Sequence, residues 1–302
     1  MKSKFKNMDK LLFLLMIIYT VLGLVMVFSA SSMTAVLQYG KSESYFFTRQ
    51  LFFVILAYIC GFIILFMPNK FIRLFKKTSN LLGIISIILL FITWTSGIHA
   101  NGATSWLKIG PIRLQPSEFV KTFMICSIAF AFNNPKKAFY KYRFLLPFSY
   151  VVIYLALIFA QPDLGTDMIV AIIAFLMFMA LPIRNGNQKK LKIVAGTIAV
   201  CVVCMFAMGS DILKGALTEE QLSRFVYKNP CARYSEKTGY QVCNGYIAIN
   251  NGGLFGVGLG NSTQKYLYLP EAYTDFIFPI IVEELGSITA GVIIIGFIIM
   301  LY

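Results

Sequence analysis

The sequence predicts an all-α polytopic membrane protein, a bundle of helices with one large extracytoplasmic loop. Of its 302 residues, 58% are hydrophobic, and the mean hydropathy is +0.74, well above the apolar share of an average soluble domain. A helix needs about 18 or more nearly uncharged residues to cross a hydrocarbon core, and eight stretches meet that requirement. The eight predicted spans are residues 11–29, 51–68, 79–97, 116–133, 144–160, 164–182, 193–210 and 276–302.

The basic residues predict the orientation of these spans. Sixteen of the 27 lysines and arginines precede the first span or follow the second, fourth and sixth, with Asp9 as their only acid. Because cytoplasmic loops carry an excess of Lys and Arg, these segments and the amino terminus are expected inside. Topology and attraction to anionic lipid account for the net charge of +14 without a nucleic-acid partner. Residues 1–30 end in small residues, as a cleaved signal would, but their long apolar run favours a membrane anchor.

Alternation then assigns the outer loops. They are residues 30–50, 98–115, 161–163 and 211–275. Only the last is long, and no repeat or linker marks a second domain, so residues 1–302 are expected to form one membrane domain. Cys231 and Cys243 lie in that loop, on the side where cysteines can oxidise, and form either a disulfide or two independent thiols. The other four cysteines lie in spans, where they act as small apolar residues, and no metal site is expected.

Ionisable residues within or beside the spans are functional hypotheses, because each costs a few kcal/mol in a membrane. They are Arg49, Lys108, Arg113, Glu118, Lys121, Asp163, Asp167, Asp275, Glu283 and Glu284. All but Glu283 and Glu284 map to the outer half of the membrane or its outer surface, which predicts a substrate site that opens outward. Glu283 and Glu284 lie roughly 12 Å deeper at about 1.5 Å per residue, and must face protein or water rather than lipid.

Each candidate also has a structural interpretation. Glu118 and Lys121 are three residues apart in the first turn of a helix and can pair on one face, either to settle the helix end or to form a cationic pocket with Arg113. Asp163 can cap the following helix. Asp275, or Thr274 beside it, can cap the last one. These alternatives remain open at the level of sequence.

Three segments together resemble one family of bacterial cell-wall proteins. The segments are GATSWLKIGPIRLQPSEFVK, QPDLGTD and GYQVCNGYIAINNGGLFGVGLGNSTQKYLYLPEAYTDFIFPIIVEELG. They are similar to the SEDS family, which includes the elongation protein RodA, the division protein FtsW and their sporulation relative. The hydropathy is also similar, so the resemblance covers essentially the whole chain. The stretch LGNSTQKYLYLPEA is more similar to the division branch than to the elongation branch.

The resemblance implies a peptidoglycan glycosyltransferase of the bacterial cytoplasmic membrane. Such proteins polymerise lipid II, the undecaprenyl-pyrophosphate-linked precursor, at the outer face, alongside a class B penicillin-binding transpeptidase and other divisome or elongasome membrane proteins. The family's essential aspartate falls on Asp275, the expected catalytic base. The expected substrate-binding residues are Arg113, Lys121, Glu118, Glu271, Lys265 and Asp163. The sequence requires no cofactor, although Mg²⁺ or Mn²⁺ would suit carboxylates and phosphates.

Two departures from the family pattern qualify this expectation. Members often have His at the position of Tyr273, so any role of that imidazole is absent here. The family has ten spans, whereas this chain ends at Tyr302 within the eighth, and we expect a fragment without the last two. Two other functions stay open. The protein could be a flippase for lipid II, and a flippase needs a path to the cytoplasm. It could also be a non-catalytic scaffold that recruits the transpeptidase, and a scaffold needs neither that path nor an external acid.

Overall fold

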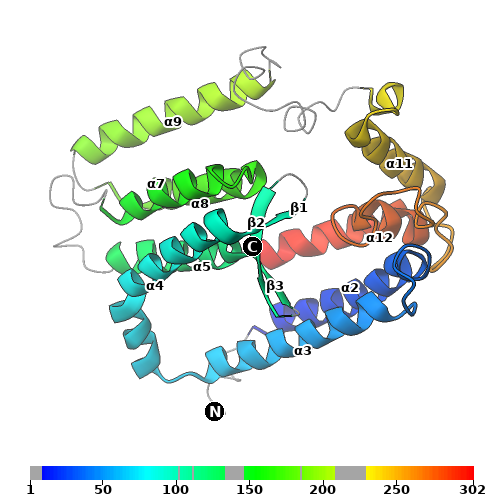
Figure 1. The fold of residues 1–302 in the computed structure, drawn as a ribbon, viewed down its shortest axis with the longest axis horizontal. Coiled ribbons are helices and arrows are strands. Elements are labelled where there is room, and N and C mark those ends of the chain that lie inside the picture. Colours follow the sequence, from blue (N-terminus) through cyan, green and yellow to red (C-terminus); the bar gives the residue numbers. More distant parts are fainter. Residues whose placement is uncertain (1–8, 101–102, 111, 133–145, 184–185, 208–228) are drawn as a thin grey trace. The chain divides into compact units, whose positions relative to one another are not determined.

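The computed structural model describes residues 9–100, 103–110, 112–132, 146–183, 186–207 and 229–302 (Figure 1). Within them, a helix occupies each of the eight predicted spans. These helices are α2 (Lys10–Leu37), α3 (Tyr45–Phe66), α4 (Asn69–Ser96), α5 (Pro116–Phe132), α7 (Leu146–Phe159), α8 (Leu164–Ala180), α9 (Gly186–Ala207) and α12 (Ile277–Leu301). The predicted all-α class is therefore confirmed. All basic residues at 2–6 and 136–143 lie outside the described residues. So do residues 211–228 of the predicted outer loop.

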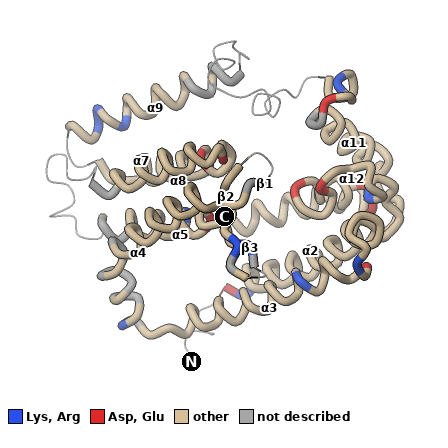
Figure 2. Tube along the Cα trace, viewed as in Figure 1, with Lys and Arg blue, Asp and Glu red and all other residues tan. Residues whose placement is uncertain are grey.

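Hydropathy distinguishes three of the described helices. α2, α3 and α12 are long and apolar enough to cross a membrane, whereas the apolar parts of α4, α7 and α8 are shorter. Beyond Lys10, α2 carries no charged residue, and neither does α7 (Figure 2). The membrane class of the protein follows from these helices, while the count of eight crossings stays a prediction.

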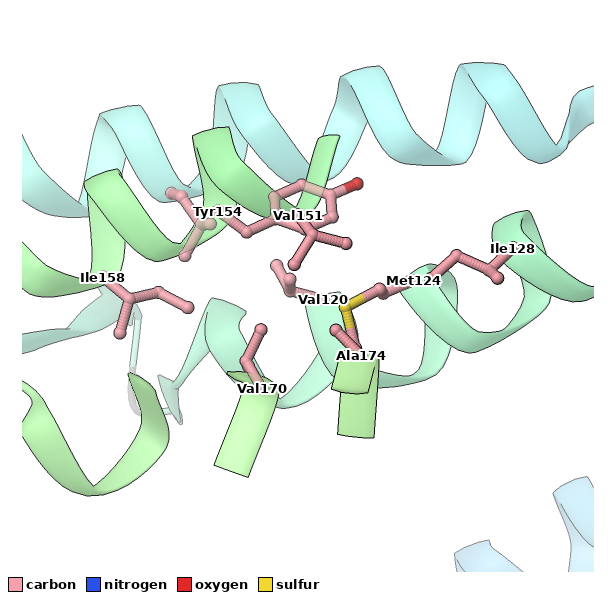
Figure 3. Packing of buried hydrophobic residues seen from close by; sticks show 9 residues of the cluster. Val120, Met124, Ile128, Val151, Tyr154, Ile158, Val170 and Ala174 are labelled. Carbon is pink, nitrogen blue, oxygen red and sulfur yellow. The ribbon is translucent and has the colours of Figure 1, made fainter. Parts of the chain in front are cut away.

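The chain divides into two compact units, Met1–Met67 with Glu219–Tyr302, and Pro68–Thr218. In the second unit, α4, α5, α7 and α8 enclose an apolar core. Its buried members are Leu90, Val120, Met124, Ile128, Val151, Tyr154, Ile158, Val170 and Ala174. Figure 3 shows their side chains converging between the helices. That residues 1–302 form one membrane domain stays a prediction.

A small antiparallel sheet stands where the sequence predicted only an outer loop. Its strands are β1 (Ile98–Ala100), β2 (Ala103–Ile109) and β3 (Ile112–Leu114), in that spatial order. The backbone N–H of Thr104 in β2 donates to the carbonyl oxygen of Gln161 at 3.1 Å, which ties the sheet to the turn before α8. The sheet therefore brings Arg113 and Asp163, both predicted site residues, onto one connected framework.

The first unit is built on α2 and α12. α2 packs against α3 and α12, and a further helix, α11 (Lys237–Gly252), packs against α12 and the short helix η3 (Pro230–Arg233). A disulfide joins Cys231 of η3 to Cys243 of α11. The sequence was compatible with either a disulfide or two independent thiols for this pair, and the structure contains the disulfide.

α12 is interrupted at Gly286, whose backbone is not helical (φ 84°, ψ 163°). The loop after α11 supplies the hydrogen bonds that the interruption removes. The N–H groups of Val257 and Gly258 donate to the carbonyls of Glu283 and Glu284, at 2.9 and 3.0 Å. In return, the N–H groups of Ser287 and Ile288 donate to the carbonyls of Gly253 and Leu254, at 3.0 and 3.3 Å. The backbone groups left unpaired at the kink and in the loop therefore form hydrogen bonds with each other.

Gly286→Ala is expected to lower the free energy of unfolding by on the order of 3 kcal/mol. A Cβ there would lie 2.3 Å from the carbonyl oxygen of Leu254, and the positive φ disfavours any side chain. The control is Gly291→Ala in the same helix, where no heavy atom lies within 4 Å and alanine gains up to about 1 kcal/mol of helix propensity. Thermal unfolding in detergent measures both, and equal unfolding temperatures would contradict the role of the kink.

Candidate functional site

Asp275 lies immediately before α12 with an exposed carboxylate. α12 begins after Phe276, and no side chain caps it. The hydroxyl of Thr274 donates instead to Glu271 Oε2 at 2.9 Å. The capping interpretation of Asp275 and Thr274 is therefore wrong. Throughout the described part of the chain, no hydrogen bond or ion pair engages the carboxylate of Asp275.

The backbone around Asp275 is held by a strained turn. Glu271 has φ 53°, a left-handed conformation that costs roughly 1–2 kcal/mol for a residue other than glycine. Its carbonyl oxygen accepts the N–H groups of Thr274 and Phe276, both at 3.1 Å. Strain of this kind is found at functional sites. The turn leaves the side chain of Asp275 exposed, and it places the exposed Glu271 four residues before it.

The turn rests on apolar packing and an aromatic contact. Leu269 and Ala272 are buried against α2, in a cluster with Met26 and Ala30. The ring of Tyr273 lies with its centroid 4.5 Å from that of Phe46. Burial raises the pKa of the Tyr273 phenol, with Tyr39 and Glu271 adding to the shift. The phenol therefore remains protonated at neutral pH and cannot replace a histidine as a base.

Beneath this turn lies a buried ion pair. The ammonium of Lys265 lies 3.1 Å from Glu284 Oε1, and the two side chains are 4% and 0% exposed. The hydroxyl of Ser29 in α2 donates to Glu284 at 2.7 Å, and Lys265 also donates to the carbonyl of Gly260. These bonds tie α2, α12 and the loop together. Substrate binding by Lys265 stays a prediction, and in this structure its ammonium is occupied internally.

Glu283 is fully buried and is satisfied by the same loop. It accepts the backbone N–H of Thr263 at 3.2 Å, the hydroxyl of Thr263 at 2.8 Å and the N–H of Gln264 at 3.3 Å. Ser262 and Asn251 donate to it as well. The prediction that Glu283 and Glu284 face protein or water is confirmed, and the partner is protein. Sequence reasoning missed Ser29, because its run of small residues was interpreted only as signal-like.

The second unit carries two of the predicted cations, Arg113 and Lys121. Lys121 Nζ lies 2.8 Å from Glu118 Oε2, with side-chain exposures of 20% and 54%, so the predicted i,i+3 pair forms. Arg113 in β3 stands opposite Lys108 in β2, and both are exposed. Like charges directly opposite each other destabilise a sheet, a cost that a bound anion would offset.

Asp163 is the N-cap of α8. Its carboxylate accepts the backbone N–H of Thr166 at 3.1 Å and the Thr166 hydroxyl at 2.9 Å. It also accepts Ser105 Oγ at 2.9 Å and Gln115 Nε2 at 3.2 Å. The capping interpretation is confirmed, and Asp163 also fixes β2 and the residue before α5. Its role in substrate binding stays a prediction.

The family model described as "Cell cycle protein", which covers FtsW, RodA and SpoVE, matches residues 9–302. This chain belongs to the FtsW/RodA/SpoVE family. The family assignment drawn from the sequence is thereby confirmed.

Relatives of this family member include two proteins of Bacillus subtilis (strain 168). Its probable peptidoglycan glycosyltransferase FtsW is 36% identical over 99% of this chain and 74% of the relative. Its stage V sporulation protein E is 30% identical, over 100% of this chain and 79% of the relative. The chain thus spans about three quarters of the length of these relatives. The curated relatives that are named FtsW agree with the predicted similarity to the division branch.

Two solved structures share the fold. One is described as "Structural coordination of polymerization and crosslinking by a peptidoglycan synthase complex", with a TM-score of 0.66, 21% identity, and coverage of 98% of this chain and 76% of that chain. The other is a mutant of the rod shape determining protein RodA of Thermus thermophilus, with a TM-score of 0.59, 20% identity, and coverage of 98% and 73%. At these identities the likeness shows the fold alone.

In this FtsW/RodA family member, the predicted site residues fall in both units. Asp275, Glu271 and Lys265 belong to the first unit, and the cationic group with Asp163 belongs to the second. Across the residues that the structure describes, no group of three or more His, Cys, Asp or Glu side chains could hold a metal ion. Each unit therefore offers a different chemistry: a free carboxylate in the first and exposed cations in the second.

Proposed function

We propose that this chain is a peptidoglycan glycosyltransferase that polymerises lipid II at the outer face of the bacterial cytoplasmic membrane, in division or elongation. One observation carries the proposal. Among the predicted site acids, all of them in the described residues, only Asp275 is both exposed and free of side-chain hydrogen bonds and ion pairs. The carboxylate of Asp167 also lacks such a partner, but it is partly buried in the first turn of α8. Glu118, Asp163, Glu271, Glu283 and Glu284 all have partners. The names of the FtsW relatives support the same activity.

The reaction requires a base and a stabilised leaving group. A hydroxyl oxygen of one sugar forms a bond to the anomeric carbon of another precursor, and the bond from that carbon to undecaprenyl pyrophosphate breaks. Asp275 takes the proton of the attacking hydroxyl. Arg113 and Lys121 stabilise the negative charge that develops on the departing pyrophosphate. Glu118 orients the ammonium of Lys121.

The proposal assigns no step to a metal ion. The described residues around Asp275 offer one free carboxylate rather than a cluster of ligands, and Mg²⁺ prefers several oxygen ligands. Any Mg²⁺ or Mn²⁺ would need phosphate oxygens of the substrate to complete its coordination. Its chemistry would be the neutralisation of pyrophosphate charge.

The orientation and the partners belong to the same proposal. The amino terminus lies in the cytoplasm and Asp275 outside, as the distribution of basic residues indicates. The partner is a class B transpeptidase that crosslinks the product, together with other divisome or elongasome membrane proteins. A chain with this fold occurs in the solved structure of a peptidoglycan synthase complex that coordinates polymerization and crosslinking. That likeness supports a crosslinking transpeptidase as the partner.

Neither alternative function has a specific observation in its favour. A flippase needs polar groups that line a path, but Glu283 and Glu284 are closed off by protein donors. A scaffold needs no free carboxylate at the membrane boundary, and it leaves Asp275 unexplained.

The test uses purified full-length protein and labelled lipid II, with and without a class B transpeptidase. Glycan strands formed by the protein, alone or with its partner, are the expected result. Transfer of lipid II across proteoliposomes without polymer would replace the proposal with the flippase. Binding of the transpeptidase with neither activity would replace it with the scaffold.

Arg113→Gln and Lys121→Gln are each expected to weaken precursor binding by about tenfold or more, since hydrogen bonds to charged groups contribute about 1.5–3 kcal/mol. Glu118→Gln should act more mildly, because it leaves Lys121 present but poorly aimed. The matched control is Lys41→Gln, an exposed outer lysine of the first unit. Binding of labelled lipid II to each purified variant is the measurement. Unchanged affinity in well-folded Arg113→Gln and Lys121→Gln proteins would exclude the phosphate site.

A further inference from the structure

The predicted outer loop contains a long segment without charge. No charged residue occurs between Lys237 and Lys265, a run of 27 residues at positions 238–264. Soluble loops are normally polar, whereas a membrane-embedded segment excludes charge. Lys265, which ends the run, is itself buried against Glu284.

The tip of this segment exposes large apolar side chains. Phe255 is 82% exposed and Leu254 is 62% exposed, and Val257 and Leu259 are exposed as well. In the second half of α11, the large side chains of Tyr246 and Ile249 are exposed as well. A patch of this kind on a water-facing loop is uncommon, and it marks a surface that contacts protein or membrane.

Hydrogen bonds place the tip well below the start of α12. Residues 253–258 bond to residues 283–288, which lie about 9 to 16 Å along α12 from Ile277 at about 1.5 Å per residue. Figure 1 shows α11 and the loop after it beside the first half of α12. Since a hydrocarbon core is about 30 Å thick, that range runs from the outer half of the core to about its midplane.

Several polar groups in the backbone of the tip are satisfied by protein. Irregular backbone inside a membrane is tolerated only where protein satisfies its polar groups. The exchange with α12 satisfies the N–H groups of Val257 and Gly258 and the carbonyls of Gly253 and Leu254. A Cβ on Gly256 would lie 2.3 Å from the carbonyl oxygen of Glu284, so glycine permits this close approach.

The exposed tip is continuous with the apolar surface of α12. The N–H of Ile288 donates to Leu254, and Ile288 and Val292 are exposed on α12 beyond that bond. α12 is one of the helices long and apolar enough to cross a membrane. A surface that joins the lipid-facing side of a span, and lacks charge, suits acyl chains.

We propose that residues 246–259 form a re-entrant segment whose apolar side chains contact lipid acyl chains in the outer leaflet. This segment enters the membrane along α11, turns at the glycine-rich tip and returns towards Lys265. It anchors, from the lipid side, the loop that leads to Asp275. The proposal does not depend on the chemistry of that residue.

The test measures the depth of the tip with a single tryptophan. Trp94 and Trp106, the two tryptophans of the chain, are first replaced by Phe. Phe255→Trp and, as the control, Tyr234→Trp are then made separately in this background. Tyr234 is also an exposed aromatic, but it lies beside the disulfide at the end of η3. The full chain is reconstituted in phosphatidylcholine–phosphatidylglycerol vesicles with or without lipids brominated along the acyl chain.

The Phe255→Trp protein is expected to lose about half of its fluorescence in brominated lipid, as an apolar side chain inserted below the headgroups would. The Tyr234→Trp protein should lose a tenth or less, and should instead be quenched by aqueous iodide. Iodide quenching of Phe255→Trp equal to the control would place the tip in water and overturn the proposal. Protection of Phe255→Trp from both quenchers would overturn it too, because the tip would then pack against protein.

Discussion

The Asp275→Asn variant is expected to form no detectable glycan while remaining as well folded as the parent. General-base catalysis contributes roughly 10²–10⁴-fold to a rate, and an amide cannot accept the proton of the attacking hydroxyl. The folded state should be unaffected, because in the described residues no hydrogen bond or ion pair depends on this carboxylate. Polymerisation of labelled lipid II and thermal unfolding are measured on the same preparation.

Glu43→Gln is the matched control for this experiment. Glu43 is another exposed acid of the first unit, in the predicted outer loop 30–50, and its replacement removes the same charge at a different position. It should retain polymerisation. If Asp275→Asn makes near-normal product, Asp275 is not the base. If Glu43→Gln is as inactive as Asp275→Asn, the loss reflects surface charge rather than catalysis.

Lys265→Met is expected to cause the largest loss of stability, about 3–5 kcal/mol, because it leaves Glu284 buried without its cation. Glu284 is 1% exposed, so water cannot solvate its charge. The substitution also removes the tie from Lys265 to Ser29 and Gly260, which holds the loop against α2. Chemical or thermal unfolding in detergent measures the change.

Two further variants make the cause of that loss testable. Lys121→Met breaks the partly exposed pair with Glu118, and such pairs contribute about 0–1 kcal/mol. The double variant Lys265→Met with Glu284→Met removes both buried charges, and it should recover most of the stability. If Lys265→Met costs no more than Lys121→Met, the buried pair does not hold the loop. Failure of the double variant to recover would mean that packing, not unpaired charge, explains the loss.

Hydropathy anticipated the helices of the eight predicted spans, but neither α11 nor the sheet. Twelve of the sixteen predicted span ends lie within three residues of a helix end, and the other four differ by six to ten residues. The spans could be located because a run of apolar residues is a property of neighbours along the chain. Strands β1 to β3 are seven residues or fewer, too short for their pattern to stand out from a loop. Their pairing depends on contacts such as that of Thr104 with Gln161, which no local pattern encodes.

The sequence by itself determined the membrane class, the family, and Asp275 as the acid most worth testing, since those rest on composition and contiguous motifs. It also required that Glu283 and Glu284 meet protein or water, because charge at that depth is costly. Only the tertiary structure decided that Asp163 is a cap and Asp275 is not, and that Ser29 meets Glu284. Those two residues are 255 positions apart, and a hydrogen bond depends on where the folded chain brings its atoms, a property that residue order alone does not display.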